Sequence, residues 1–185
     1  MGIDFYDAKF RELLLYIAQQ CRDDVFFGAT KLNKQLFFAD FLAFRNLGQP
    51  ITGADYMALE HGPGPRRLLP IRAEMICNGE LAIDVRAHQD RIVALREPDK
   101  GVFTEDELAI VDDVIEELRD ATADEVSKFS HRFAGWLAAM KEGNATGRHV
   151  SIPYETVFVE QVPFSPDIIA RGRELAAKYD WPVQW

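Results

Sequence analysis

The four histidines of this chain are the side chains best suited to acid–base catalysis near neutral pH. His61 lies beside a Gly-Pro turn, and His131 follows Ser130 in a predicted helix. A hydrolytic triad needs a nucleophile on a sharp turn, a histidine and an orienting carboxylate, and the sequence contains no G-x-S-x-G motif. Ser130 and His131 are neighbours in the chain, so their side chains point apart on a helix. We therefore expect no catalytic residues and no enzyme, with a small hydrolase that uses His61 and His131 as the weaker alternative.

Spacing gives no support for a metal site either. The sequence has no HxxxH, HExxH or CxxC motif, so we expect no metal ion and no cofactor. Cys21 and Cys77 each lie among apolar residues and are predicted to be small buried thiols, as is usual in a reducing compartment. The first residues lack the basic and apolar regions of a signal peptide, and no apolar run is long enough to span a bilayer. These features predict a cytoplasmic protein without a membrane partner.

Length and composition predict one globular domain over residues 1–185. A chain of 185 residues, 48% of them hydrophobic, is long enough to bury a single large core. The net charge is −9 at pH 7. So acidic a chain repels phosphates, which weighs against a nucleic-acid partner, although a local basic patch could still form.

Two helices are predicted in the first quarter of the chain. Apolar residues recur at helical spacing over residues 7–22. The second helix, over residues 30–46, is apolar on nearly every side, and Phe38 and Leu42 form a third apolar sector beside its two main stripes. A helix of this kind either lies at the centre of a bundle or is shared between the core and a partner surface. We interpret it as the central helix, which ends at Gly48.

Glycine and proline shape the next part of the chain. Residues 49–65 are rich in both and predict an ordered loop with short extended pieces. A third helix lies within residues 65–78, where Pro70 fits only the first turn or a kink. Alternating β-branched residues then predict an antiparallel hairpin with strands at residues 81–85 and 91–95. Helices followed by a hairpin are similar in order to a winged helix, an observation about topology that does not by itself imply DNA binding.

Two capping boxes open the helices of the C-terminal half. One begins at Thr104 and the other at Thr122, and the second helix is predicted to extend toward a loop at residues 143–147. Residues 152–163 fit either a short helix or an extended arm, and residues 165–179 are predicted as a last helix. The predicted fold class is therefore mainly α (α+β). It is a single-domain helical bundle with a small antiparallel β-hairpin and a winged-helix-like arrangement in the middle.

Two segments carry a distinctive pattern. Residues 31–40 read Lys-Leu-Asn-Lys-Gln-Leu-Phe-Phe-Ala-Asp, and residues 56–65 read Tyr-Met-Ala-Leu-Glu-His-Gly-Pro-Gly-Pro. A lysine-flanked aromatic helix followed by a Tyr…His-Gly-Pro-x-Pro turn resembles the SocA-like antitoxin domain, also called the Panacea domain. The Ser…Ser-His…Trp spacing over residues 127–136 and the Ile-Pro-Tyr run at residues 152–154 are similar to the same pattern. The resemblance thus covers most of the chain.

The resemblance implies an antitoxin: a protein of bacteria or their phages that neutralises a co-encoded toxin by direct binding, within a toxin-antitoxin system. Some such proteins act as adaptors that deliver the toxin to a protease, so both blocking and delivery stay open. The implied partner is a cognate protein toxin, and a protease is a further candidate. A second copy of the chain, in a homodimer, is another candidate partner, because the apolar surface of the second helix is split. A winged-helix-like transcriptional regulator is the alternative from another functional class.

The resemblance also assigns roles to single residues. Five are expected to contact the partner: Lys31, Lys34, Tyr56, His61 and Arg66. The other motif positions are expected to hold the fold: Phe37, Phe38, Asp40, Gly62, Pro63, Pro65, His131 and Trp136. For the two lysines, a solvated face that keeps an aromatic helix soluble is an equal alternative. The acidic series over residues 105–120 is most simply a solvated helix face, and it could also meet a basic toxin.

Overall fold

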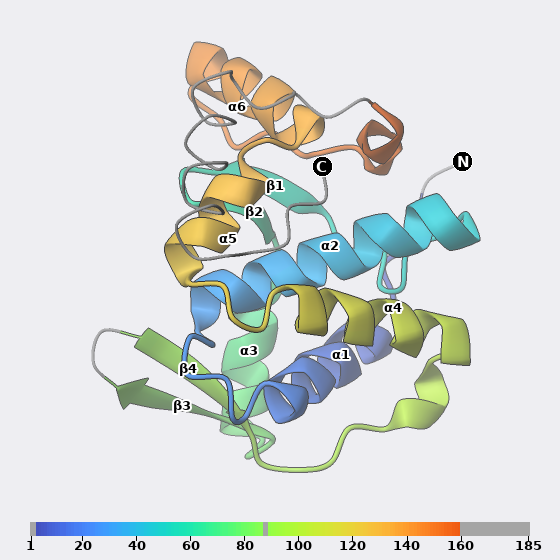
Figure 1. Ribbon diagram of the computed structural model, residues 1–185, viewed down its shortest axis with the longest axis vertical. Coiled ribbons are helices and arrows are strands. Elements are labelled where there is room, and N and C mark those ends of the chain that lie inside the picture. The colour runs from blue at the N-terminus through green and yellow to red at the C-terminus, as the bar shows by residue number, and fades with distance from the viewer. Residues whose placement is uncertain (1–2, 87–88, 160–185) are drawn as a thin grey trace, which may run out of the picture.

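The structure is a computed structural model that describes residues 3–86 and 89–159 (Figure 1). The described residues form α-helices, two short 3₁₀ helices and two two-stranded sheets. In chain order these are α1 (Asp7–Gln20), α2 (Ala29–Leu47), β1 (Tyr56–Leu59), β2 (Gly62–Pro65), α3 (Leu68–Cys77), β3 (Leu81–Arg86), β4 (Gln89–Ala94), η1 (Lys100–Val102), α4 (Glu105–Glu117), α5 (Ala123–Ser130), α6 (Ala134–Thr146) and η2 (Tyr154–Phe158). The chain is mainly α with two small antiparallel hairpins, which confirms the predicted fold class.

Helix α2 lies at the centre of the molecule, as its all-round apolar character predicted. It packs against α1, α4, α5, β2 and η2, and Figure 1 shows it crossing the middle of the fold. Phe37 and Phe41 contact the rings of Tyr56 and Phe133 at centroid separations between 5.1 and 5.7 Å. The helix ends at Gly48, whose φ of 80° forms the left-handed cap that the sequence predicted.

The glycine- and proline-rich segment after α2 forms a hairpin. Strands β1 and β2 pair antiparallel with Leu59 opposite Gly62, so Glu60 and His61 make a two-residue turn. Gly62 has a φ of 97°, a conformation that L side chains rarely adopt. A β-bridge from β1 to Ser151 adds a short piece of the distant chain beside this sheet. The extended pieces predicted here are therefore joined into a sheet that lies against α2.

Helix α3 and the second hairpin follow the prediction closely. Helix α3 begins at Leu68, so Pro70 lies in its first turn, where the missing N–H removes no helical hydrogen bond. Strands β3 and β4 pair antiparallel, with Leu81 opposite Ala94.

The C-terminal helices depart from the prediction. Both capping boxes are present, at Thr104 and Thr122. The second box does not open one long helix, because α5 ends at Ser130 and α6 begins at Ala134. Between them Phe133 takes an extended conformation with ψ at 122°, and its ring is buried in the core. Burial of this ring against α2 takes the place of a further helical turn.

The prediction of a loop at residues 143–147 is wrong. Helix α6 continues through Gly143 to Thr146 and ends at Gly147, whose φ is 67°. A Cβ on Gly143 would lie 2.8 Å from the carbonyl oxygen of Arg148. Glycine is therefore needed at this position for close backbone approach inside the helix, and not for a turn.

Three smaller predictions have separate outcomes. Cys21 is buried at the end of α1 whereas Cys77 is exposed, so the prediction of two buried thiols holds only for Cys21. Part of the ambiguous segment 152–163 is the 3₁₀ helix η2. The last helix predicted over residues 165–179 lies outside the described residues.

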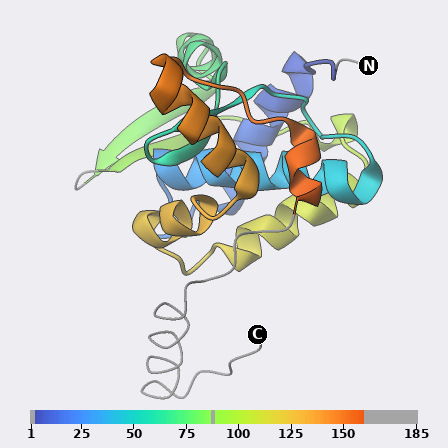
Figure 2. The same cartoon turned by 90° about the horizontal axis from the view of Figure 1, so that it is seen from above.

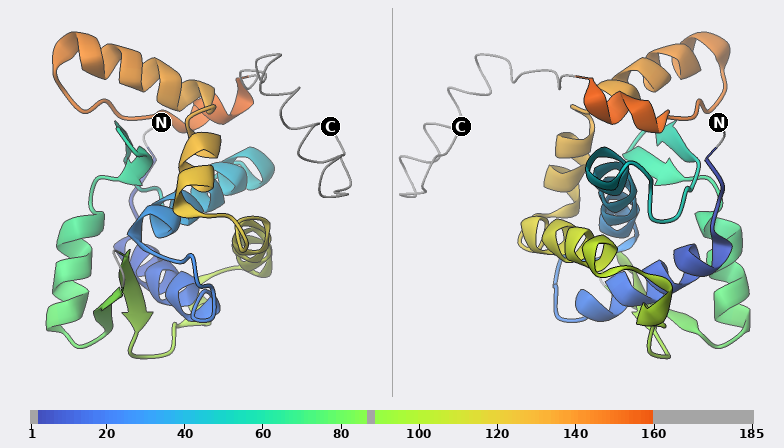
Figure 3. Two further views of the ribbon diagram at one scale, coloured as in Figure 1. Left: turned by 60° about the vertical axis from the view of Figure 1, so that its left-hand side comes forward. Right: turned by 90° about the vertical axis from the view of Figure 1, so that its right-hand side faces the viewer.

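Segments from distant parts of the chain surround α2. Seen from above, α4 and α5 lie along the same side of α2 (Figure 2). Helix α6 and η2 lie with the first hairpin at one end of the molecule, and α1 lies with the second hairpin at the opposite end (Figure 3). Among the described helices, none combines the length and the apolar character that crossing a membrane requires.

Candidate functional site

Lys31 lies inside the fold. Its side chain is fully buried, and its Nζ pairs with Asp24 Oδ2 at 2.6 Å. The same Nζ donates to the backbone carbonyls of Arg119 and Ala121, at 2.7 and 3.0 Å, just beyond the C-terminus of α4. Lys31 therefore fastens the connection between α4 and α5 to α2.

Lys34 lies one turn further along α2 and is 1% exposed. Burial lowers the pKa of its ammonium from the ordinary 10.5 to about 8. Among the described residues, no charge or hydrogen bond offsets this desolvation. Strand β2 passes directly beside it, because a Cβ on Gly62 would lie 2.7 Å from Lys34 Cε and would also collide with Ser130 Oγ. The absence of a side chain at Gly62 allows α2, β2 and α5 to meet here.

Asp40 and Tyr56 form the centre of a buried hydrogen-bond network. Asp40 accepts hydrogen bonds from the backbone N–H of Thr52 at 2.7 Å and from its hydroxyl at 2.5 Å. The hydroxyl of Tyr56 lies 2.7 Å from Asp40 Oδ2 and 2.8 Å from the carbonyl of Leu36. Burial raises the pKa of Asp40, while the hydrogen bonds that it accepts act in the opposite direction. Tyr154 from η2 also reaches Asp40, at 3.4 Å, so the network joins α2, β1 and η2.

His131 and Trp136 hold the turn of the first hairpin. Their rings stack with centroids 4.1 Å apart and an interplanar angle of 9°. Trp136 Nε1 donates to the carbonyl of Leu59 at 3.1 Å, and Ser127 Oγ donates to the carbonyl of His61 at 2.8 Å. Burial lowers the pKa of His131 below its ordinary 6.5, so its imidazole is neutral at pH 7. These contacts lie between α5, α6 and the hairpin, and the fold-holding role expected of His131 and Trp136 stays a prediction.

Of the five residues predicted to contact a partner, His61 and Arg66 are exposed. Arg66 pairs with Asp55 at 2.6 Å and donates to Ser151 Oγ at 3.3 Å. The other three are buried: Lys31, Lys34 and Tyr56. Partner contact by His61 and Arg66 stays a prediction. A partner would reach the three buried side chains only by opening the fold.

The remaining motif residues lie mostly inside the fold as well. Phe37 is fully buried, and Pro63 and Pro65 are buried in β2. Phe38 is different, because its ring is only half-buried on the side of α2 that faces α4 and α5.

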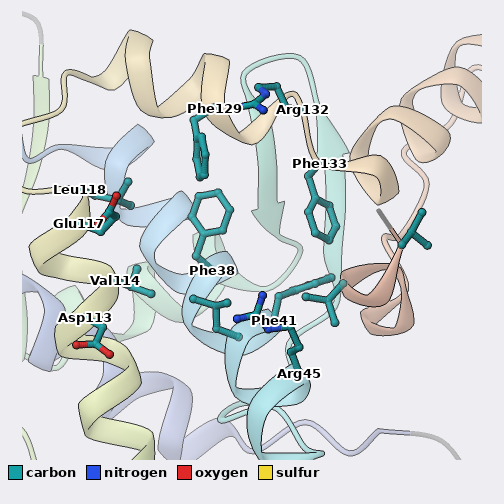
Figure 4. Close-up of a pocket in the computed structure, with 13 residues that line it drawn as sticks. Phe38, Phe41, Arg45, Asp113, Val114, Glu117, Leu118, Phe129, Arg132 and Phe133 are labelled. Carbon is teal, nitrogen blue, oxygen red and sulfur yellow. The ribbon is translucent and has the colours of Figure 1, made fainter. Parts of the chain in front are cut away.

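An apolar groove of about 450 Å³ opens at Phe38, beside α2 and between α4, α5 and η2 (Figure 4). Its aromatic lining comes from Phe38 and Phe41 of α2, with Phe129 and Phe133 from α5 and the turn after it. The rings of Phe38 and Phe129 lie 5.3 Å apart, and Phe129 is 51% exposed. The other residues that line the groove are Leu42, Arg45, Asp113, Val114, Glu117, Leu118, Arg132, Val157 and Val159. A grooved apolar surface with charged residues at its rim is typical of an interaction site.

Charged side chains flank the groove on different sides. Asp113 and Glu117 are exposed one turn apart on α4, and neither makes an ion pair with the described residues. Arg45 from α2 and Arg132 from the turn after α5 lie on other sides of the groove (Figure 4). The groove therefore combines an apolar floor with an acidic wall on α4.

The sequence had given only part of this groove. Phe38 was expected to hold the fold, and the third apolar sector that it forms with Leu42 was one reason to consider a surface shared with a partner beside the preferred interpretation as a central helix. Phe129 was not among the candidate residues, and nothing in the sequence marked its ring as exposed.

The described residues offer little that suits catalysis or metal binding. No group of three or more His, Cys, Asp and Glu among them could hold a metal ion. Burial raises the pKa of the Cys21 thiol to about 11, which keeps it protonated and unreactive. Ser130 Oγ donates to the carbonyl of Ser127 at 2.8 Å and lies against the hairpin.

A comparison with known families tests the resemblance to the Panacea domain. Residues 32–137 match the family described as Antitoxin SocA-like, Panacea domain, over more than half of the chain. This chain belongs to that family. It matches no curated protein and no solved structure.

The Panacea match begins in the first turn of α2 and ends in the first turn of α6. It contains the Lys34–Gly62 contact, the pairing of Asp40 with Tyr56 and the stacked rings that hold the hairpin turn. It also contains the lining of the groove except for its η2 side. Core residues outside the match include those of α1, Phe27, Ala139, Ile152 and Tyr154.

Proposed function

We propose that this chain is an antitoxin that neutralises a co-encoded toxin by binding it directly. The observation that carries the proposal is membership of the Panacea family, whose description is that of an antitoxin. The geometry supports it, because four polar residues of the motif are buried inside the fold and are not open to a partner: Lys31, Lys34, Asp40 and Tyr56. What stays open to a large partner is an apolar groove with a charged rim and an exposed hairpin turn.

Direct binding can neutralise a toxin in two ways. A blocking antitoxin covers the toxin's active surface and leaves the toxin intact in the complex. An adaptor presents the toxin to a protease, so the amount of toxin falls. The amount of toxin present during rescue therefore distinguishes blocking from delivery. We further propose that the protein acts in the cytoplasm, with a protease and a second copy of the chain as additional partners.

The test is co-expression of the full chain with the small protein encoded beside it in its native genome. We expect that protein to stop growth when it is made alone and growth to return when the antitoxin is made with it. A tagged antitoxin should co-purify it in near-equal amounts. A neighbour that is harmless alone, or toxicity that persists beside soluble antitoxin, contradicts the proposal.

A further inference from the structure

The groove beside α2 has features that select one kind of occupant. We propose that it binds an amphipathic helix of the partner, whose apolar stripe is flanked on one side by lysine or arginine residues. This inference rests on the proposed function, because it names the part of the toxin that the antitoxin would hold.

The apolar part of the proposal follows from the shape of the groove. Helix α2 forms the floor, α4 lines one side and α5 lies across the top of the view, so an inserted helix would contact all three helices (Figure 4). Phe129 is the most prominent ring, since half of it is exposed although it lies next to Phe38. Helices bind such grooves through side chains at positions i, i+3 or i+4, and i+7, which form one apolar stripe. Aromatic rings that lose their remaining exposure are the usual anchors of such contacts.

The charged part of the proposal follows from α4. Asp113 and Glu117 are four residues apart, so they lie one helical turn apart on the rim. A partner helix that runs alongside α4 presents its own residues i and i+4 at the same spacing. Basic residues at those positions would pair with both carboxylates, and the net charge of −9 also favours encounter with a basic partner. Arg45 on another side of the groove disfavours a helix that is basic on both flanks.

The same charges argue against a second copy of this chain as the occupant. Two copies would approach with a charge of −9 each. The exposed face of α4 is acidic in both, so self-docking at this rim would bring like charges together.

Two synthetic peptides test the proposal with the full chain. Each is about 18 residues long, enough for a bound helix of five turns, and both carry the same leucine stripe. One has lysines along a single flank and the other has glutamates there. Fluorescence anisotropy should show the lysine peptide binding about tenfold more tightly than the glutamate peptide, as expected for two exposed ion pairs gained in one case and two repulsions in the other. Equal binding of both peptides overturns the charged part of the proposal.

Charge reversal and removal of the anchor make the test specific to the groove. The double variant Asp113→Lys, Glu117→Lys should reverse the preference and bind the glutamate peptide more tightly. Phe129→Asp should weaken both peptides by about 30-fold or more, as loss of a central aromatic anchor does. Leu69→Asp is the matched control, because Leu69 is 64% exposed on α3 and lies away from the groove. If Leu69→Asp weakens binding as much as Phe129→Asp does, the peptides bind elsewhere and the proposal fails.

A photocrosslinker identifies the occupant directly. The full chain with Phe129→p-benzoylphenylalanine should form a cross-link to the lysine peptide under light. A product with the mass of two chains would assign the groove to a second copy. A cross-link to residues 160–185 that the peptide does not displace would assign it to the chain's own C-terminal segment, and either result overturns the proposal.

Growth rescue keeps the two proposals apart. If the wild-type chain and Phe129→Asp both rescue growth equally, the antitoxin function stands and the groove is not where the toxin binds. If the wild-type chain rescues no toxin while the charge-dependent peptide pattern holds, the groove binds helices but the antitoxin function fails.

Discussion

Replacing Lys34 with methionine should stabilise the fold at neutral pH, and the gain should shrink as pH rises. Lys34 is 1% exposed, and burial lowers the pKa of its ammonium from 10.5 to about 8. Between these two values the unfolded chain holds a proton that the folded chain has lost, so stability rises with pH. At about 1.36 kcal/mol per pKa unit, the buried ammonium lowers the free energy of unfolding by about 3 kcal/mol below pH 8. This penalty should fall to about 2 kcal/mol at pH 9 and disappear above pH 10.5. Methionine has a similar length and no charge, so the variant lacks the penalty.

Urea denaturation of wild type and Lys34→Met at pH 7, 8 and 9 measures the effect. Any loss of packing in the variant is independent of pH. The pH dependence of the difference in unfolding free energy between the variant and wild type therefore reports on the ammonium alone. That change should be about 1 kcal/mol between pH 7 and 9. Titration of the Cys21 thiol, whose pKa is raised to about 11, is common to both proteins and cancels. Lys141→Met, at an exposed position of α6, is the control and should show no such change. A difference for Lys34→Met that stays constant from pH 7 to 9 would refute the buried, unpaired ammonium.

Three further substitutions test the contacts that hold the fold, each by urea denaturation at pH 7. Gly62→Ala should lower the free energy of unfolding by about 2–4 kcal/mol, because the added Cβ collides with its neighbours at a position that already has a φ of 97°. Gly147→Ala is the comparison and should lower it by only about 1 kcal/mol, because Gly147 has a φ of 67° but no atom within 4 Å of the added Cβ. Equal costs at the two glycines would mean that β2 has room to move away from α2. Tyr56→Phe should cost about 1–3 kcal/mol, because buried Asp40 loses a donor at 2.7 Å, and an unchanged midpoint would show that another donor replaces it. Thr104→Ala removes the side-chain half of a capping box and should cost about 1 kcal/mol, unless water caps α4 equally well.

The elements that the sequence predicted correctly have local signals. The capping box at Thr104 and the terminal Gly48 act within a few residues, so they can be recognised without the rest of the fold. The break between α5 and α6 has no such signal, since residues 130–134 contain neither glycine nor proline. It depends on Phe133 packing onto α2, far away in the sequence. Gly143 led to the opposite error, a loop predicted where the chain is helical. Its small size is needed because the carbonyl of Arg148 packs against the helix at this position.

The two lysines show why the site was harder to predict than the fold. On a helical wheel a lysine beside phenylalanines indicates a solvated or binding surface. The carbonyls that accept from Lys31 lie 88 and 90 residues further along the chain, so no spacing rule could find them. The groove has the same property, because Phe38 and Leu42 were visible as a separate sector while the opposite wall comes from α4 and α5.

Helix α2 therefore has two kinds of side chain with separate consequences for function. Its polar residues hold neighbouring elements, so substitutions there should change the folded fraction and, through it, the amount of antitoxin in the cell. Its Phe38 sector faces the groove, so substitutions around it should change affinity for the partner with little effect on folding. Loss of rescue by Asp40→Ala should accordingly be relieved at lower growth temperature, where more of the variant is folded. Loss of rescue by Phe129→Asp should persist at every temperature, with soluble protein at the wild-type level. If both variants respond to temperature in the same way, stability alone explains them and the groove has no separate role.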